Sequence, residues 1–202
     1  MDSVKPLAKG ARSRQTILRT AASLATVDGL EGLSIGNLAT HLGMSKSGLY
    51  AHFGSKEELQ LATVETAKEI FDADVVEPSA ALDDPLARIR ALCFAFIDHI
   101  ERRVFPGGCF FASVGAEFDT HPGAVQDRIA ELQTEWTNGL QALIEEAQIR
   151  DQLRAEEDPA ALAFDLDSFI LNGNTRFVLT NDASYLRLAR TSIDRRLSEA
   201  TV

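Results

Sequence analysis

Apolar side chains recur at steps of three and four residues along almost the whole chain. This spacing places them on one face of an α-helix, whereas a strand with one buried face needs every second residue. The stripes cover residues 85–104, 122–144, 159–177 and 186–197, and the six prolines lie at the boundaries of periodic segments. No sustained run alternates with period two. We therefore predict an all-α fold.

Charge divides the chain into two unequal parts. The 202 residues carry a formal net charge of −10, but residues 1–56 hold seven Lys and Arg against three Asp and Glu. Residues 57–202 hold 13 Lys and Arg against 27 Asp and Glu. We interpret this as a basic module that attracts an anionic partner, followed by an acidic module with a different role. A chance fluctuation on a solvated surface is the alternative.

Composition and apolar segments also limit the cellular setting. The longest uninterrupted apolar stretch, residues 91–97, is too short to cross a bilayer. The start, Met-Asp-Ser-Val-Lys-Pro, has none of the apolar character of an export signal. With only Cys93 and Cys109, a disulfide framework is not expected. We expect a reduced, soluble, cytoplasmic protein without a membrane partner.

The basic module divides into short helical segments. Residues 12–27 form an amphipathic segment, and Ser34 can cap a second segment over residues 35–42. The tight turn Gly43-Met44-Ser45 precedes a third segment over residues 46–53. Two short helices across such a turn form a helix-turn-helix.

A capping box, Ser55-Lys56-Glu57-Glu58, predicts that a longer helix starts there and runs to about residue 75. This helix would join the two modules. We therefore expect an N-terminal three-helix, helix-turn-helix DNA-binding domain over residues 1–56. A larger helical ligand-binding and dimerisation domain would follow over residues 57–202.

The third segment has the side chains that a helix in the major groove needs. Leu49 and Phe53 are spaced to anchor it inward, which leaves small and basic residues outside. Base edges would be contacted from the first turn of this helix, whereas the remaining candidates suit phosphates or the minor groove. The candidate DNA-binding residues are Arg12, Arg14, Ser34, Ser45, Lys46, Ser47, Gly48, Tyr50, His52 and Lys56.

The same segment resembles the DNA-binding domain of the TetR family of transcriptional regulators. The residues that carry the resemblance are Ile17-Leu18, Ala21-Ala22, Gly29, Ser34-Ile35, Leu38-Ala39, Leu42-Gly43-Met44-Ser45-Lys46, Leu49-Tyr50, His52-Phe53 and Ser55-Lys56-Glu57-Glu58-Leu59. Ser47 and Gly48 depart from the commonest pattern, which has glycine and then threonine or another small polar residue. The resemblance implies a homodimer that binds a palindromic operator, usually a repressor released by a small ligand, with coupling through the helix that starts at Lys56. Residues 107–118 and the helix after Pro122 resemble one subgroup of the family's C-terminal domains.

The acidic module holds most of the aromatic side chains, several of which can line a cavity for a partly apolar ligand. The candidate pocket residues are Phe94, Phe96, Phe110, Phe111, Phe118, Trp136, Phe164 and Asn172. Ordinary core packing is the alternative for any one of the aromatic residues.

The last two helical stripes offer apolar faces for a second copy of the chain. The candidate interface residues are Leu166, Phe169, Ile170, Gly173, Phe177, Leu186 and Ile193. A two-fold four-helix interface would bury these faces, and a dimer would double the contacts of one short recognition helix. The alternative is that both helices pack only on their own subunit.

Other candidate chemistry has weaker support. Glu117, Asp119 and His121 suggest a metal site, but this arrangement is more typical of a solvated surface. Cys109 follows two glycines near a helix start, where a thiolate can be favoured, although a small buried residue is the simpler interpretation. No catalytic motif, metal set or cofactor motif is recognised. The alternative function is a helical-bundle enzyme, or a carrier of an apolar small molecule, that does not bind DNA.

Overall fold

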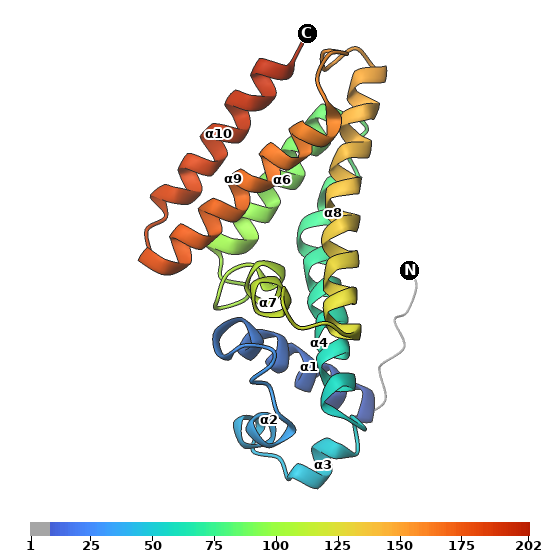
Figure 1. Ribbon diagram of the computed structural model, residues 1–202, viewed down its shortest axis with the longest axis vertical. Coiled ribbons are helices and arrows are strands. Elements are labelled where there is room, and N and C mark those ends of the chain that lie inside the picture. The colour runs from blue at the N-terminus through green and yellow to red at the C-terminus, as the bar shows by residue number, and fades with distance from the viewer. Residues whose placement is uncertain (1–8) are drawn as a thin grey trace.

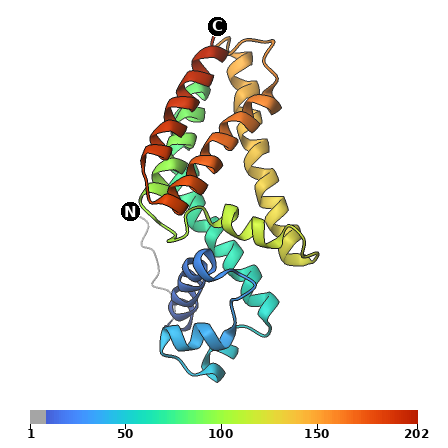
Figure 2. The same ribbon diagram turned by 60° about the vertical axis from the view of Figure 1, so that its left-hand side comes forward.

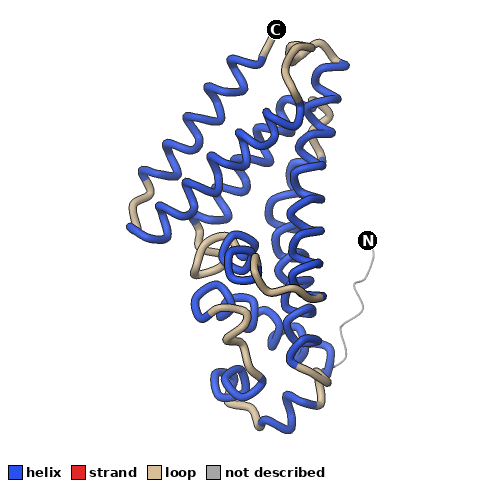
Figure 3. The backbone as a smooth tube through the Cα atoms, viewed as in Figure 1, coloured by secondary structure: helices blue, strands red, loops and turns tan. Residues whose placement is uncertain are grey.

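The computed structural model describes residues 9–202, with side chains from residue 13 onward, and this part of the chain is mainly helical (Figure 1, Figure 3). The elements are α1 (Lys9–Asp28), α2 (Ile35–Leu42), α3 (Lys46–Tyr50), α4 (Lys56–Phe71), the π-helical turn η1 (Asp72–Val76), α5 (Glu77–Ala80), α6 (Pro85–Glu101), α7 (Phe110–Phe118), α8 (Ala124–Ile149), α9 (Pro159–Thr180) and α10 (Ser184–Ala200). Among the described residues the only β-pairing is one isolated bridge between Leu153 and Thr201. The all-α prediction is confirmed.

The molecule is elongated, with α1, α2 and α3 at one end and α6, α8, α9 and α10 at the other (Figure 1, Figure 2). Helix α4 runs from the smaller end into the larger one, and α7 lies between the two ends. No described helix combines the length and the apolar character needed to cross a membrane.

Side-chain caps start these helices at the residues that the sequence indicates. The Ser34 hydroxyl accepts a hydrogen bond from the Asn37 N–H at 3.1 Å, so α2 begins at the expected residue. The Ser55 hydroxyl accepts from the Glu58 N–H at 3.0 Å, and the Glu58 carboxylate accepts from the Gly54 N–H at 2.9 Å. The predicted capping box is therefore present, with the glutamate reaching one residue further back than the standard pattern.

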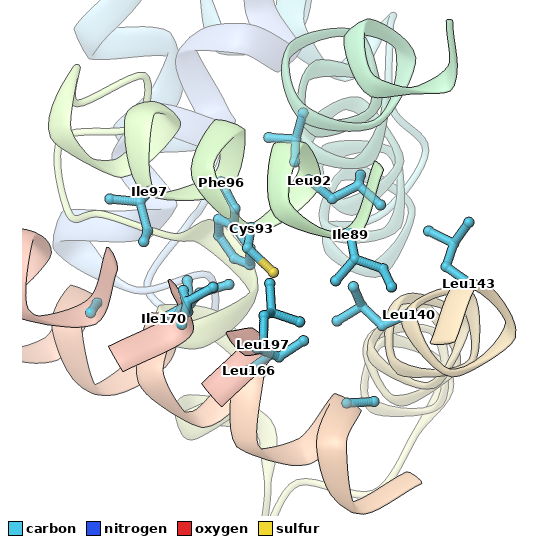
Figure 4. Packing of buried hydrophobic residues seen from close by; sticks show 14 of the residues in the cluster. Ile89, Leu92, Cys93, Phe96, Ile97, Leu140, Leu143, Leu166, Ile170 and Leu197 are labelled. Carbon is cyan, nitrogen blue, oxygen red and sulfur yellow. The ribbon is translucent and has the colours of Figure 1, made fainter. Parts of the chain in front are cut away.

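Two apolar clusters hold the fold together. The first, called the head core here, contains Ile17, Leu18, Ala21, Ala22, Ala25, Leu30, Leu33, Ile35, Leu38, Ala39, Leu49, Phe53, Leu59, Val64, Ala67, Phe105, Phe110, Val114, Phe118, Val125, Ile129 and Leu132. The second, the bundle core, joins the larger helices, and Figure 4 shows Ile89 and Cys93 of α6 near Leu140 of α8, Leu166 of α9 and Leu197 of α10.

The head core does not stop at the predicted domain boundary. Leu59 and Val64 of α4 belong to it, and so do Phe110 of α7 and Ile129 of α8. The boundary between residues 56 and 57 thus crosses a continuous apolar core and stays a prediction. Because the core is shared, α4 and α7 pack directly on α1, and the first half of α8 joins the core through α4 and α7.

Hydrogen bonds strengthen the contact between α7 and the helix-turn-helix. The Glu117 carboxylate of α7 accepts from the backbone N–H groups of Leu30 at 2.7 Å and Glu31 at 2.9 Å, in the loop between α1 and α2. The Gly107 N–H donates to the Thr26 hydroxyl at 3.0 Å. The loop before α7 and the end of α7 are therefore both fastened to the end of α1 and the loop that follows it.

Gly107 tests how closely this loop must approach α1. A Cβ atom at Gly107 would lie 1.9 Å from the Thr26 carbonyl oxygen, so Gly107→Ala must push the loop away from α1. We expect a loss of about 1–3 kcal/mol in the free energy of unfolding, the range for overpacking, measured by chemical denaturation. Gly139→Ala is the matched control, since a Cβ there meets nothing within 4 Å. Equal stability of the two variants would contradict the close approach.

Candidate nucleic-acid interface and ligand cavity

Helix α3 is held from inside and leaves its outer face open. Leu49 and Phe53 are buried in the head core, as their spacing predicts. The Ser45 hydroxyl caps the helix by accepting from the Gly48 N–H at 3.1 Å. Lys46 and Ser47 are exposed, and Tyr50 has 58% of its surface exposed. The first turn of α3 and the Tyr50 ring are therefore accessible to a partner.

Helix α3 is shorter than the sequence suggests. It ends at Tyr50, and Ala51 and His52 form a turn where residues 46–53 were expected to be helical. This turn lets Phe53 point back into the head core before α4 starts. His52 is half-buried and lies outside the recognition helix, so only the residues up to Tyr50 are presented by α3 itself.

The charged candidates differ in whether an acidic side chain pairs with them. Lys46 forms no ion pair with any described residue, and the Arg14 guanidinium lies 5.0 Å from the centre of the Phe53 ring. Lys56, in contrast, pairs with Glu31 at 2.7 Å. Lys46 and Arg14 therefore offer the less compensated positive charge. The side chain of Arg12 lies outside the described residues.

The remaining candidates lie beside the same helix. Ser34 is half-buried and caps α2, and Gly48 is half-buried within α3. The hydroxyls of Ser45 and Ser47 are 3.3 Å apart. The structure thus brings the described DNA-binding candidates together around α3 and the starts of α2 and α4.

A cavity of about 880 Å³ lies in the larger end of the molecule, a size within the range of small-molecule sites. Its walls come from α4, α6, α7, α8 and α9, together with η1 and α5. One wall is aromatic: the rings of Phe71, Phe96 and Trp136 pack edge to face with centroids 4.9 to 5.4 Å apart. This cavity can take a partly apolar molecule.

Four of the predicted pocket residues line the cavity, namely Phe96, Phe111, Trp136 and Phe164. The other four lie elsewhere. Phe110 and Phe118 are buried in the head core, Phe94 lies under the Arg190 guanidinium at 4.9 Å, and Asn172 is exposed on α9. The sequence analysis missed the charged residues of the wall, among them Lys68, Arg88 and Asp167. One sequence feature could have indicated two of them: a charged residue next to an apolar stripe, as for Arg88 before Ile89 and Asp167 after Leu166.

The Asp167 carboxyl group is one of the polar groups on the wall. It is half-buried, and burial raises its pKa, although the hydrogen bond from Trp136 Nε1 at 2.9 Å opposes this shift. Lys68 pairs with Asp72 four residues later. The cavity thus combines an aromatic wall with a few polar groups.

The predicted dimer residues lie in the subunit's own core. Leu166, Ile170, Gly173, Phe177, Leu186 and Ile193 are buried, and Phe169 packs against the bundle core. A Cβ at Gly173 would lie 3.0 Å from the Ala189 Cβ, so the small residue serves the crossing of α9 and α10. In this conformation these side chains are not available to a second copy. An interface on α9 and α10 would use their outward faces instead.

The two weaker candidates have structural explanations. Glu117 accepts backbone hydrogen bonds from Leu30 and Glu31, and His121 contacts the Glu117 carbonyl oxygen at 2.8 Å. Among the described residues, no group of three His, Cys, Asp or Glu side chains is arranged to hold a metal ion. Cys109 is buried, and burial raises its thiol pKa to about 11, which is opposite to the shift that a reactive thiolate needs.

An exposed recognition helix on a helix-turn-helix, joined to a helical domain with a cavity, defines a transcriptional regulator of the helix-turn-helix class. Family models agree. Residues 17–63 match the model of bacterial regulatory proteins of the tetR family, and residues 85–193, more than half of the chain, match the tetracyclin repressor-like C-terminal domain. The chain belongs to the TetR family. It is therefore a DNA-binding transcriptional regulator and not an enzyme.

Individual proteins show the same similarity. The transcriptional regulator AcuR of Cereibacter sphaeroides is 25% identical over 155 residues, which cover 75% of this chain and 69% of AcuR. A TetR regulator from Chloroflexus aurantiacus has a crystal structure that matches with a TM-score of 0.85 at 25% identity, over 96% of this chain and 98% of that one. The structure of AibR in complex with isovaleryl coenzyme A and operator DNA matches with a TM-score of 0.74 at 24% identity, over 90% and 96% of the two chains.

Burial of the two thiols, Cys109 on the cavity wall and Cys93 in the bundle core, gives a direct test of the packing there. Because burial raises the thiol pKa of Cys109 to about 11 and that of Cys93 to about 12, both stay protonated at pH 8. Relative to an ordinary cysteine of pKa about 8.5, the thiolate fraction is lower by a factor on the order of 100 or more. A thiol reagent such as Ellman's reagent should leave the native protein unmodified for hours and react with both cysteines after unfolding. Rapid reaction of the native protein would contradict this environment.

Proposed function

We propose that the protein is a homodimeric repressor of a palindromic operator, released when a small, partly apolar ligand occupies the cavity. One observation carries the proposal: two helices touch both the cavity and the helix-turn-helix. Helix α4 contributes Phe71 to the cavity wall and Leu59 to the head core. Helix α7 contributes Phe111 to the cavity wall and Glu117 to the loop between α1 and α2.

The connection through α4 is short and continuous. Its first turn follows the recognition helix after a few residues, and the buried Gln60 side chain donates to the Leu30 carbonyl oxygen at 2.9 Å. Its other end passes into the π-helical turn η1, of which Asp72 and Val76 line the cavity. Such turns are common at functional sites of helices. A ligand that displaces Phe71, just before this turn, would move α4 together with the head that packs on it.

Release requires only a modest coupling. Two recognition helices that bind one face of the duplex must sit about 34 to 36 Å apart. A ligand that binds better to a different separation shifts the population away from the operator-binding state. A coupling free energy of about 1–3 kcal/mol between ligand and DNA is typical of allosteric proteins.

The outward faces of α9 and α10 support dimerisation. Leu179 on α9 has 78% of its surface exposed, and Leu188 on α10 has 59% exposed. Large apolar side chains at this exposure favour contact with a partner. The two helices lie side by side along one edge of the molecule, where a second copy can form a four-helix interface (Figure 1).

One relative supports both parts of the proposal, which are the binding of a ligand and the binding of an operator. AibR, which shares this fold, has been crystallised with isovaleryl coenzyme A and operator DNA together. The fold therefore accommodates an acyl ligand and a duplex in the same protein. We extend this pairing of ligand and operator, without the identity of either, to the present chain.

The dimer is tested by placing a charge on its proposed face. Leu188→Glu should produce monomers, because a carboxylate buried in an apolar interface lacks a partner. Light scattering coupled to size exclusion gives the mass. Leu82→Glu is the control, since Leu82 is also exposed but lies between α5 and α6. A monomeric wild type, or an unchanged dimer in Leu188→Glu, would contradict the interface.

DNA binding is tested with the duplex upstream of the protein's own coding region. Affinity measured by fluorescence anisotropy should fall steeply as salt rises, because phosphate contacts release counterions. Lys46→Ala should weaken binding by about tenfold or more, the effect of losing one good base or phosphate contact.

Arg150→Ala is the matched control for Lys46→Ala. It removes the same charge from the end of α8, far from α3, and its ion pairs are exposed surface pairs (Figure 1). Its affinity for the duplex should equal that of the wild type. If Lys46→Ala and Arg150→Ala bind equally well, the recognition role of α3 is wrong.

A further inference from the structure

The cavity wall contains two charged groups that nothing else on the wall compensates. Most of its charges are paired: Lys68 with Asp72, Glu135 with Arg128 at 3.5 Å, and Glu146 with Arg150 at 2.6 Å. The exceptions are Arg88 of α6 and Asp167 of α9.

The Arg88 side chain has no partner among the described residues. Its guanidinium group forms no hydrogen bond and no ion pair there, and the Nε atom is buried without a hydrogen-bond acceptor. A buried donor without an acceptor is costly, and the cost is greater for a charged group. The planar guanidinium group suits a carboxylate or phosphate, which can accept two parallel hydrogen bonds. Arg88 therefore indicates an anionic group on the ligand.

Asp167 uses only half of its capacity to accept hydrogen bonds. One carboxyl oxygen accepts from Trp136 Nε1 at 2.9 Å, and the other has no partner among the described residues. No cation approaches it, and burial raises its pKa. The free oxygen therefore indicates a hydrogen-bond donor on the ligand.

The two groups lie at separate places along an apolar wall. Trp136, the partner of Asp167, packs on Phe96 with ring centroids 5.3 Å apart. Phe96 follows Arg88 by eight residues on α6, which is a rise of about 12 Å along a helix. Leu92 lies between them and also lines the cavity. A ligand that reaches both polar groups therefore has an apolar body between them.

We propose that the cavity binds an amphipathic organic acid with a hydrogen-bond donor at its far end. Its carboxylate pairs with Arg88, its apolar body lies along Leu92 and Phe96, and its donor meets the free oxygen of Asp167. The inference rests on the proposed function only in taking the bound molecule to be the effector. It adds the chemical class of that effector.

Trp136 reports binding directly. It is the only tryptophan of the chain, and it lies on the cavity wall against Asp167. The probes are decanoate, 10-aminodecanoate and 1-decanol, below their aggregation concentrations and without DNA. Decanoate should bind at least tenfold more tightly than 1-decanol. The donor-bearing 10-aminodecanoate should bind at least as tightly as decanoate.

Two variants separate the two polar contacts. Arg88→Met keeps the length of the side chain and should abolish the preference for decanoate over 1-decanol. Asp167→Asn keeps an oxygen for the Trp136 N–H but puts an N–H₂ group where the free oxygen lies. An ammonium group can only donate, so 10-aminodecanoate should bind this variant at least tenfold more weakly than it binds the wild type. Decanoate should bind both proteins equally.

The wild type alone can overturn the inference, even if a variant fails to fold. It is wrong if none of the three probes changes the Trp136 fluorescence, or if 1-decanol binds as tightly as decanoate. Unchanged probe selectivity in folded Arg88→Met and Asp167→Asn would also overturn it. Duplex binding measured on the same preparation tests the proposed function separately. DNA binding without acid binding rejects only this inference, and acid binding without DNA binding rejects only the proposed repressor of that operator.

Discussion

The structure depends on one apolar core that the helix-turn-helix shares with α4, α7 and the first half of α8. The three helices of a small head cannot bury enough apolar surface alone, because a smaller domain buries a smaller fraction of its surface. Phe110 and Phe118 of α7 complete this core from outside the head. Glu117, next to Phe118 in the sequence, fixes the loop between α1 and α2 through two backbone hydrogen bonds. The head is therefore not an independent unit on a linker, because packed side chains join it to the larger domain.

The elements could be predicted because their signals are local. The Ser34 and Asp158 caps and the prolines at residues 85 and 159 set helix starts through backbone contacts within one turn. The inward anchors Leu49 and Phe53 follow from helical spacing. The end of α3 was missed because its last turn depends on where Phe53 must point, which is a tertiary constraint.

The partner of an apolar face is not a local property. Periodicity shows that Leu166, Ile170 and Phe177 are buried, but it cannot distinguish packing on α6 and α10 from packing on a second copy. The same limit separates Phe96, which lines the cavity, from Phe110, which fills the head core. Arg88 and Asp167 were missed because their meaning comes from the absence of a counter-charge nearby, and only the packed structure shows their neighbours.

The π-helical turn η1 explains why movement at the cavity would travel toward the head. The buried His99 of α6 contacts Asp74 of η1 at 2.6 Å, and Arg102 donates to the same carboxyl oxygen at 2.6 Å. Burial lowers the pKa of His99 despite the Asp74 bond, so the ring is held in its neutral form, which fits its unpaired second nitrogen. These bonds fasten η1 to α6. Phe71 packs on His99 and Phe96. A ligand that displaces Phe71 therefore moves α4 relative to η1, which these bonds hold in place. The end of α4 that remains free to respond is the one that begins at Lys56, beside the recognition helix.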